Sequence, residues 1–428
     1  MLTFSKGISL NWLEHNRDHI DNTAEFNTLT RLFPGLEEIF HKGRQKDPDE
    51  YVRTLIHTFQ TQAAYNNVCS GEFLESGLEG HALGEVRHLA GSISLFSPRL
   101  MPTILWLHDI GRLEEKSRHN EKSAEMISEF GLLGKEEFSD EEALLIQKVV
   151  RYHLLIGTLY TGESSYTSFR PLMGDGQFQG ILNNKTSLGM FLDSLTLFTI
   201  IDVWGYHIHD ISSAMIDNYM EIRREMGEIF ADRSDISGIL KALTDKSRTH
   251  MDWRLMGYMM AFSKIGKKPH LTLKFYAGMV EDGFKRYAER EGLSIDWKDF
   301  KAGYLDKMDY VQFKYGLGVL IPLSYGGTGK KMHLTEQTRM NVNLFHLLVC
   351  INNRLSKEEL TNSECIPSGL WDVVFKGYPQ WNRKTNFHQK LNDPGLIEEI
   401  IDRGTISADK DEDLNRLTLD FGGFWQDE

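Results

Sequence analysis

One short stretch constrains the fold of this chain more than any other, residues 104–112, which read ILWLHDIGR. Four apolar residues lead directly into His108 and Asp109, and Gly111 follows at once. This order predicts a buried helix whose end presents an imidazole and a carboxylate side by side. Such a pair is costly to bury unless it is compensated, and the usual compensation is a metal ion. Taken alone, the dipeptide would favour a structural pair or a surface capping role.

The composition is that of a chain that can form a large hydrophobic core. The 428 residues are 41% hydrophobic and 25% charged, and no run approaches the ~18 apolar residues of a membrane span. The net charge of −13 argues against general binding to nucleic acids. The three cysteines are far apart and the first residues lack a signal-peptide pattern, so we expect reduced thiols in a cytoplasmic protein.

Apolar periodicity predicts a mainly α fold. Helices are expected over residues 10–20, 22–32, 50–66, 82–95, 104–109, 123–130, 140–153, 188–204, 234–243, 251–262, 270–292 and 335–355. Loops are expected over residues 71–80 and 157–184, and a short strand or buried loop over 315–322. The segment 188–204 is apolar almost all round, so we place it through the core. Its charges, Asp193 and Asp202, therefore need partners.

Six residues with metal-binding side chains accompany these helices, and all but one lie on a helix or at its end. They are His57, His108, Asp109, His119, His153 and Asp202. Imidazole and carboxylate ligands suit Mn, Fe or Zn, and also Mg when more oxygen ligands are present. One such ion, or two about 3.5–4 Å apart, would polarise a phosphoryl oxygen and lower the pKa of a bound water.

The order of these residues resembles the H…HD…H…H…D signature of the HD superfamily of metal-dependent phosphohydrolases. The likeness spans roughly residues 30–230, and is strongest to the HD domains of bacterial PII uridylyl-removing enzymes and tRNA nucleotidyltransferases. The segments that carry it are LFPGLE (32–37), TLIHT (54–58), HDIGR (108–112), HNEKSA (119–124), VRYHLL (150–155) and LFTIID (197–202). HDIGR has Arg where the family pattern HDIGK has Lys. No nucleotidyltransferase motif precedes the segment and no ACT-type repeat follows it.

The resemblance implies a fold and a role for each matching residue, and together with the composition it predicts how the chain divides. We expect an N-terminal helical extension (1–47), an HD-domain helical bundle (48–231), a largely helical C-terminal region (232–405) and a loosely held acidic tail (406–428). By resemblance, the first histidine, the HD pair and the last aspartate hold one metal, the two middle histidines complete a second site, and Asp109 bridges the two. Arg112 matches a basic residue that faces the substrate phosphate, so the expected catalytic group is His108, Asp109, Arg112, His119 and His153.

The implied activity is hydrolysis of a phosphoester or phosphodiester in a nucleotide or a nucleotidylated substrate, by a metal-bound hydroxide. Two alternatives stay open. Some HD-fold proteins with all six ligands are di-iron oxygenases. The other alternative is a non-catalytic HD scaffold whose C-terminal half binds a partner, and the complete ligand set argues against it. His119 and His153 could instead contact the substrate or cap a helix. Arg112 could instead be the basic residue that commonly follows the end of a helix.

Other polar residues are expected to lie on the surface or in loops and to have no role in the site. His81 and His88 are expected on the surface, and His207 and His209 at a partly exposed helix end. Glu114 and Glu115 are expected on a solvated face. The segment 324–331 (SYGGTGKK) departs from a Walker A motif at both its first and last positions, so we expect a mobile loop there.

Overall fold

The structure is a computed structural model, and it describes most of the chain. The described residues are 7–70, 78, 80–134, 136–206, 211–231, 235–251, 253–255, 273–304, 311–313, 342–361, 363–367, 369–376, 393–410 and 414–420. They form two compact units. The first unit comprises residues 1–157 and 175–232, and the second comprises 158–174 and 233–428.

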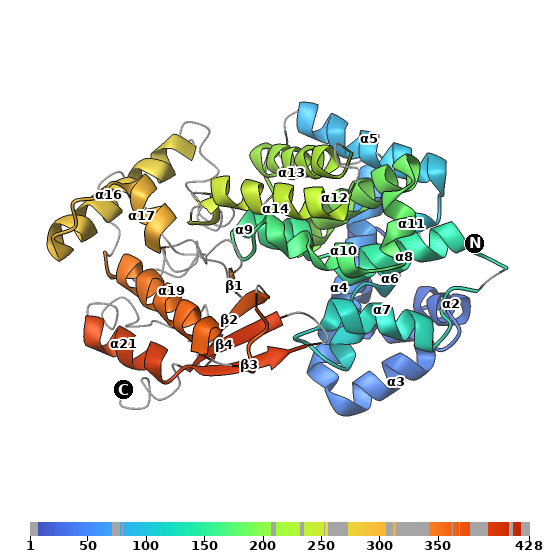
Figure 1. Ribbon diagram of the computed structural model, residues 1–428. Coiled ribbons are helices and arrows are strands. Elements are labelled where there is room, and N and C mark those ends of the chain that lie inside the picture. The colour runs from blue at the N-terminus through green and yellow to red at the C-terminus, as the bar shows by residue number, and fades with distance from the viewer. Residues whose placement is uncertain are drawn as a thin grey trace. The chain divides into compact units, whose positions relative to one another are not determined.

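Every secondary-structure element in the described residues of the first unit is a helix (Figure 1). Its elements are α1 (Leu10–Asn16), η2 (Arg17–Asn22), α2 (Ala24–Leu32), α3 (Leu36–Lys46), α4 (Pro48–Ser70), α5 (Gly80–Phe96), α6 (Leu100–Leu107), η3 (Ile110–Leu113), α7 (His119–Glu129), α8 (Asp140–Tyr152), α11 (Phe178–Leu182), α12 (Lys185–Tyr206) and α13 (Ser213–Ala231), and α9 (Leu155–Thr161) begins in it. This confirms the mainly α fold class. Short helices occupy much of residues 157–184, so the single long loop predicted there is wrong.

Helix α12 is the central element of the first unit, as predicted, and it packs against α4, α5, α8 and α13. It is long and apolar enough to cross a membrane, but 78% of its apolar stretch is buried inside the fold, which is the pattern of a core helix. Both of its acidic residues have partners. Asp193 pairs with Arg223 of α13, and Asp202 pairs with His57 of α4.

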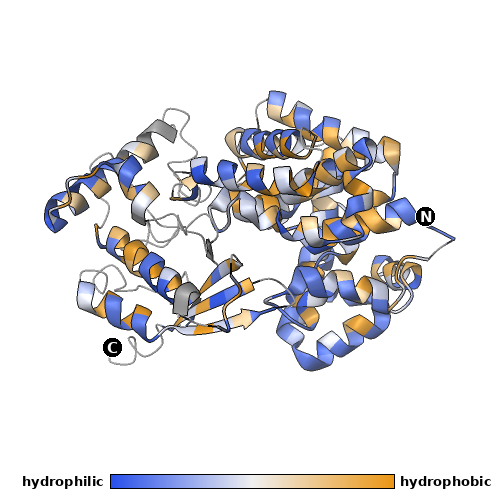
Figure 2. Cartoon of the chain, in the orientation of Figure 1, coloured by the Kyte–Doolittle hydropathy of each residue, from blue (hydrophilic) through white to orange (hydrophobic). Residues whose placement is uncertain are grey.

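Local sequence explains where the helices that carry the candidate site begin. Helix α4 starts at Pro48, and the Asp47 carboxylate accepts a hydrogen bond from the Glu50 amide at 3.0 Å. Helix α8 starts with a capping box, in which Ser139 and Glu142 satisfy each other's backbone amides. In Figure 2 many of these helices are hydrophobic on one side and hydrophilic on the other, as amphipathic helices around a core should be.

The second unit combines helices with one small sheet. Its elements are η4 (Tyr166–Phe169), α10 (Pro171–Gly174), α14 (Ile236–Thr249), α16 (Leu273–Glu291), α17 (Trp297–Tyr304), β1 (Val311–Phe313), α19 (Asn343–Thr361), β2 (Leu370–Lys376), α21 (Pro394–Asp402), β3 (Thr405–Asp409) and β4 (Leu414–Asp420). The strand order is β1-β2-β4-β3, with β3 antiparallel to β4 and the other pairs parallel. In register, Val311 lies opposite Trp371, Leu370 opposite Leu414, and Thr405 opposite Thr418.

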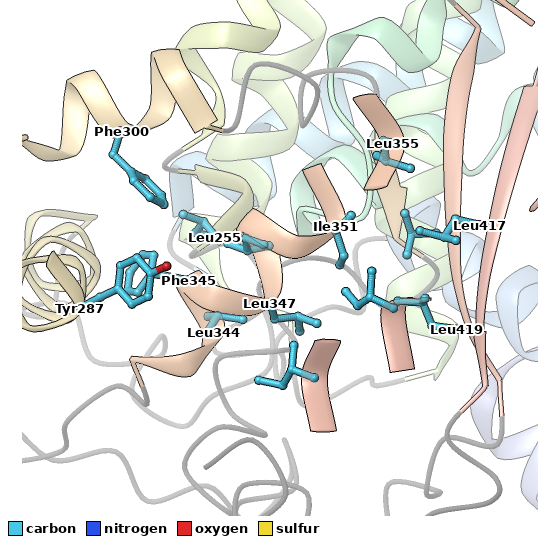
Figure 3. Close-up of a cluster of buried hydrophobic side chains, with 14 of the residues drawn as sticks. Leu255, Tyr287, Phe300, Leu344, Phe345, Leu347, Ile351, Leu355, Leu417 and Leu419 are labelled. Atoms are coloured by element: carbon cyan, nitrogen blue, oxygen red, sulfur yellow. The ribbon is translucent and has the colours of Figure 1, made fainter. Parts of the chain in front are cut away.

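A hydrophobic core joins α19 to this sheet. Figure 3 shows Leu347 and Ile351 of α19 pointing toward Leu417 and Leu419 of β4, and all four are buried. Residues 405–409 and 414–420 are therefore part of a packed sheet, and the prediction of a loosely held tail from residue 406 is wrong for these strands. The expected strand or loop at 315–322 lies outside the described residues.

Candidate metal centre

The six predicted ligands come together inside the first unit, and we refer to them as the central cluster. His57 lies on α4, His108 caps the C-terminus of α6, Asp109 precedes η3, His119 is the first residue of α7, His153 caps the C-terminus of α8, and Asp202 lies on α12. Four of the six are thus at helix ends, where side chains of different elements can meet without interrupting a helix. Within the described residues, they form two groups of three whose ligand atoms lie within 4.8 Å of one another.

The first group consists of His57, His108 and Asp202. The Nε2 atoms of the two histidines are 3.3 Å apart, and Asp202 Oδ1 is 2.8 Å from His57 Nε2 and 3.8 Å from His108 Nε2. Metal bonds of about 2.1 Å would place neighbouring ligand atoms roughly 3.0 to 3.4 Å apart, in octahedral or tetrahedral coordination. The spacing of this group is therefore compatible with a shared cation.

The second group consists of Asp109, His119 and His153. His119 Nε2 is 3.4 Å from Asp109 Oδ1, and the rings of the two histidines have centroids 5.3 Å apart. The Phe198 ring lies 4.9 Å from the rings of both His108 and His153, so an apolar wall backs both groups. Such a wall limits solvent on that side and strengthens the electrostatic interactions of the cluster.

Asp109 links the two groups through its two oxygens. Oδ2 is 3.6 Å from His108 Nε2 and 3.8 Å from His57 Nε2, whereas Oδ1 faces His119. One carboxylate thus presents one oxygen to each group. This is the arrangement that a carboxylate bridging two cations requires.

Backbone carbonyls orient three of the imidazoles. The Nδ1 atoms of His108, His119 and His153 lie 2.9, 3.1 and 2.7 Å from carbonyl oxygens three residues earlier in the chain. Because a carbonyl can only accept, each Nδ1 carries the proton and donates it. The Nε2 lone pair of each ring is then free of a proton and points toward the cluster. This is the tautomer that a metal ligand needs.

Burial and charge set the protonation of the cluster. Burial lowers the pKa of His108 and lowers that of His153 to about 3, so both rings are neutral at pH 7. Burial alone would raise the pKa of Asp109, but the adjacent His108 and His119 outweigh it and hold that pKa below its usual range. The pKa of Asp202 is likewise lowered, because His57 outweighs the effect of burial. Neutral imidazoles and ionised carboxylates are the forms that bind cations.

Arg112 lies beside the cluster, and a residue that the sequence analysis missed holds it there. Its Nε is 2.9 Å from Glu50 Oε1 and 3.7 Å from Asp109 Oδ2. Glu50 is buried, and Lys116 also pairs with it at 3.0 Å. Glu50 precedes His57 by seven residues, two turns of one helix, and this spacing was the available clue to its place on the same face of α4.

The structure places the other polar residues away from the cluster. His81 and His88 are exposed, and His81 pairs with Asp217 on the surface. Glu114 pairs with Lys122 at 3.4 Å and is also exposed, and Glu115 takes no part in either group of ligands. His207, His209 and the segment 324–331 lie outside the described residues.

Comparisons of this chain with protein-family models, with curated proteins and with solved structures find no significant match. The buried groups of histidine and aspartate could hold a metal ion. The class of reaction has to be inferred from the site itself.

Proposed function

We propose that this chain is a metal-dependent phosphohydrolase of the HD type, acting on a phosphoester or phosphodiester of a nucleotide or nucleotidylated substrate. The observation that carries the proposal is the position of Asp109, whose carboxylate faces a group of ligands on each side. The order of the six ligands in the sequence, which resembles the HD superfamily, supports the same conclusion. A bound divalent ion, Mn, Fe, Mg or Zn, would supply a Lewis acid and a water of lowered pKa.

The residues around the ligands fit a phosphorylated substrate. Solvent reaches the cluster at Asp202, Arg112 and His119, whose side chains are 24%, 16% and 12% exposed. A phosphate that approached there would meet the Arg112 guanidinium, whose charge offsets that of the phosphate oxygens. Glu50 fixes the guanidinium in place, so little side-chain freedom is lost when the substrate binds.

The test is metal analysis and phosphoester turnover of protein purified without chelators, beside an Asp109→Ala variant. We expect the variant to contain less metal and to lose phosphoester hydrolysis by more than about 100-fold, because a ligand contributes more than the groups that orient it. Asp109→Asn keeps the side-chain volume and should lose activity similarly. Asp217→Ala removes a carboxylate from the surface pair with His81 and should change neither property.

Each other outcome has a definite meaning. Phosphoester turnover that survives in Asp109→Ala would overturn the assignment of the site. Iron-dependent oxygen uptake without phosphate release would favour the di-iron oxygenase alternative. Failure of the central cluster to bind metal, even after Mn or Mg is added, would favour a non-catalytic scaffold.

A further inference from the structure

A separate group of metal-binding side chains lies in the second unit, on two neighbouring helices. His346 and Cys350 lie one turn apart on α19, and Glu398 lies on α21. His346 Nε2 is 3.1 Å from Glu398 Oε1 and 3.6 Å from Cys350 Sγ. We refer to these three residues as the α19–α21 trio. Their ligand atoms all lie within 4.8 Å of one another.

The separation between the thiol and the imidazole of the trio fits tetrahedral metal coordination. Zinc bonds of about 2.3 Å to sulfur and about 2.1 Å to nitrogen would place the two ligand atoms roughly 3.6 Å apart. The observed separation of Cys350 Sγ and His346 Nε2 is 3.6 Å. The ligand types, one thiol, one imidazole and one carboxylate, suit Zn²⁺ or a similar borderline divalent ion.

The charges around the trio also favour a cation. Burial raises the pKa of the Cys350 thiol to about 11, with smaller contributions from the negative charges of Glu398 and Asp402. A thiol in this state is a poor nucleophile, which argues against a reactive cysteine. Arg354 is the basic residue on the next turn of α19. Its guanidinium points toward Glu358 at 3.2 Å and the carbonyl oxygen of Gly404 at 3.3 Å.

We propose that His346, Cys350 and Glu398 form a second metal site, for Zn²⁺ or a related divalent ion, distinct from the central cluster. Three protein ligands leave a fourth position for water or an external ligand. When the ion binds, Cys350 loses its proton to solvent and the thiolate, imidazole and carboxylate bind together. The ion then joins α19 to α21, and so stabilises the segment of the second unit that leads into β3.

Cobalt is the appropriate probe, because a thiolate bound to Co²⁺ produces a charge-transfer absorption that histidine and carboxylate ligands do not. The central cluster contains no cysteine, so this absorption reports on the second site even if cobalt fills both. We expect the full chain to develop the absorption with one equivalent of cobalt at this site. Cys350→Ser should abolish it, and Glu398→Gln and His346→Gln should weaken cobalt binding by about 10-fold or more.

Matched controls come from the other cysteines. Cys69 is exposed and Cys365 is buried, and neither belongs to the trio. Cys69→Ser and Cys365→Ser should therefore keep the absorption. An absorption that is missing at saturating cobalt, or that persists in Cys350→Ser, would overturn the proposal.

A second measurement needs no substitution. Alkylation of Cys350 in the wild-type chain, followed by peptide mass spectrometry, should slow when Zn²⁺ is added, because the thiolate is then a metal ligand. The rate at Cys69 should not change. Equal rates at Cys350 with and without zinc would also overturn the proposal.

Discussion

The central cluster and the α19–α21 trio use similar side chains in different surroundings. His57, His108, Asp109 and His153 are buried, and all of these except His57 lie at helix ends. In the trio, Glu398 is 59% exposed, and two adjacent helices supply every ligand. Burial is the largest cause of the shifted pKa in both sites, but it lowers the pKa of His153, whereas it raises that of Cys350, where the charges of Glu398 and Asp402 act in the same direction. Packing defects should damage the first site most, and the two sites should respond to pH in opposite directions.

The largest effect is expected for Gly111→Ala, because this glycine allows η3 to approach α7. A Cβ at Gly111 would lie 2.3 Å from the carbonyl oxygen of His119 and 2.4 Å from the amide nitrogen of Ser123. Backbone atoms cannot yield as a flexible side chain can, so we expect a loss of about 3 kcal/mol in the stability of the first unit. The shift of α7 should also displace His119 and weaken metal binding at the central cluster.

The matched control is Gly91→Ala. Gly91 is an exposed residue of α5, and a Cβ there would meet nothing within 4 Å. Alanine should stabilise that helix by about 0.5–1 kcal/mol. Hydrogen exchange measured separately over α8 and α19 distinguishes the units, and exchange over α19 should be unchanged in both variants. Equal protection of α8 in the two glycine variants would contradict the role of Gly111.

The sequence was sufficient to predict the central cluster because its ligands occupy readable positions. His108 and Asp109 follow an apolar run, and Asp202 is a charge on an otherwise apolar helix, so each requires a partner. Glu50 was missed because acidic side chains are common at helix starts, where they interact favourably with the helix dipole. Its role becomes visible only when Arg112, 62 residues later, lies beside it.

Features that depend on non-local packing were harder to predict. His346 and Cys350 have the i, i+4 spacing of a shared helix face, but Glu398 joins them only through the packing of α21 on α19. The segment 406–428 contains seven acidic residues, which predict a solvated tail and conceal the strands β3 and β4. Leu417 and Leu419, two residues apart on one face of β4, are buried. Within residues 157–184, the elements η4, α10 and α11 are too short to show helical periodicity.

The stability of the first unit should fall in acid, whereas that of the second unit should fall in alkali. The folded-state pKa of His153 is about 3, below its ordinary value of 6.5, so the unfolded chain binds more protons between these values. Stability of the metal-free first unit should therefore fall as the pH falls below 6.5, by about 1.4 kcal/mol per pH unit from this residue. Between pH 6.5 and 5 this amounts to about 2 kcal/mol. His153→Gln should reduce the loss by that amount.

The trio should respond at the other end of the pH scale. The pKa of Cys350 is raised from 9.0 to about 11 in the folded chain, so its contribution to stability is present below 9.0 and is lost as the pH rises through about 11. Cys350→Ser should remove that part of the alkaline loss, whereas Cys69→Ser should not. Hydrogen exchange over α8 on the acid side and over α19 on the alkaline side measures both responses. Loss of α19 protection in acid that matches α8 would show that the two units do not titrate separately.

The smallest effect is expected at the start of α8, and it tests whether the two sites are energetically independent. The Ser139 hydroxyl accepts a hydrogen bond from the Glu142 amide at 3.2 Å, and the Glu142 carboxylate accepts one from the Ser139 amide at 2.9 Å. Ser139→Ala removes half of this capping box and should destabilise the first unit by about 1 kcal/mol. His153 lies at the far end of α8, so metal binding at the central cluster should weaken only to the extent that the helix frays. Cobalt binding by Cys350 should be unchanged, since Ser139 belongs to the other unit. A matching fall in cobalt binding at the trio would mean that the units share a folding equilibrium, and the contrast between the two sites would then be one of chemistry alone.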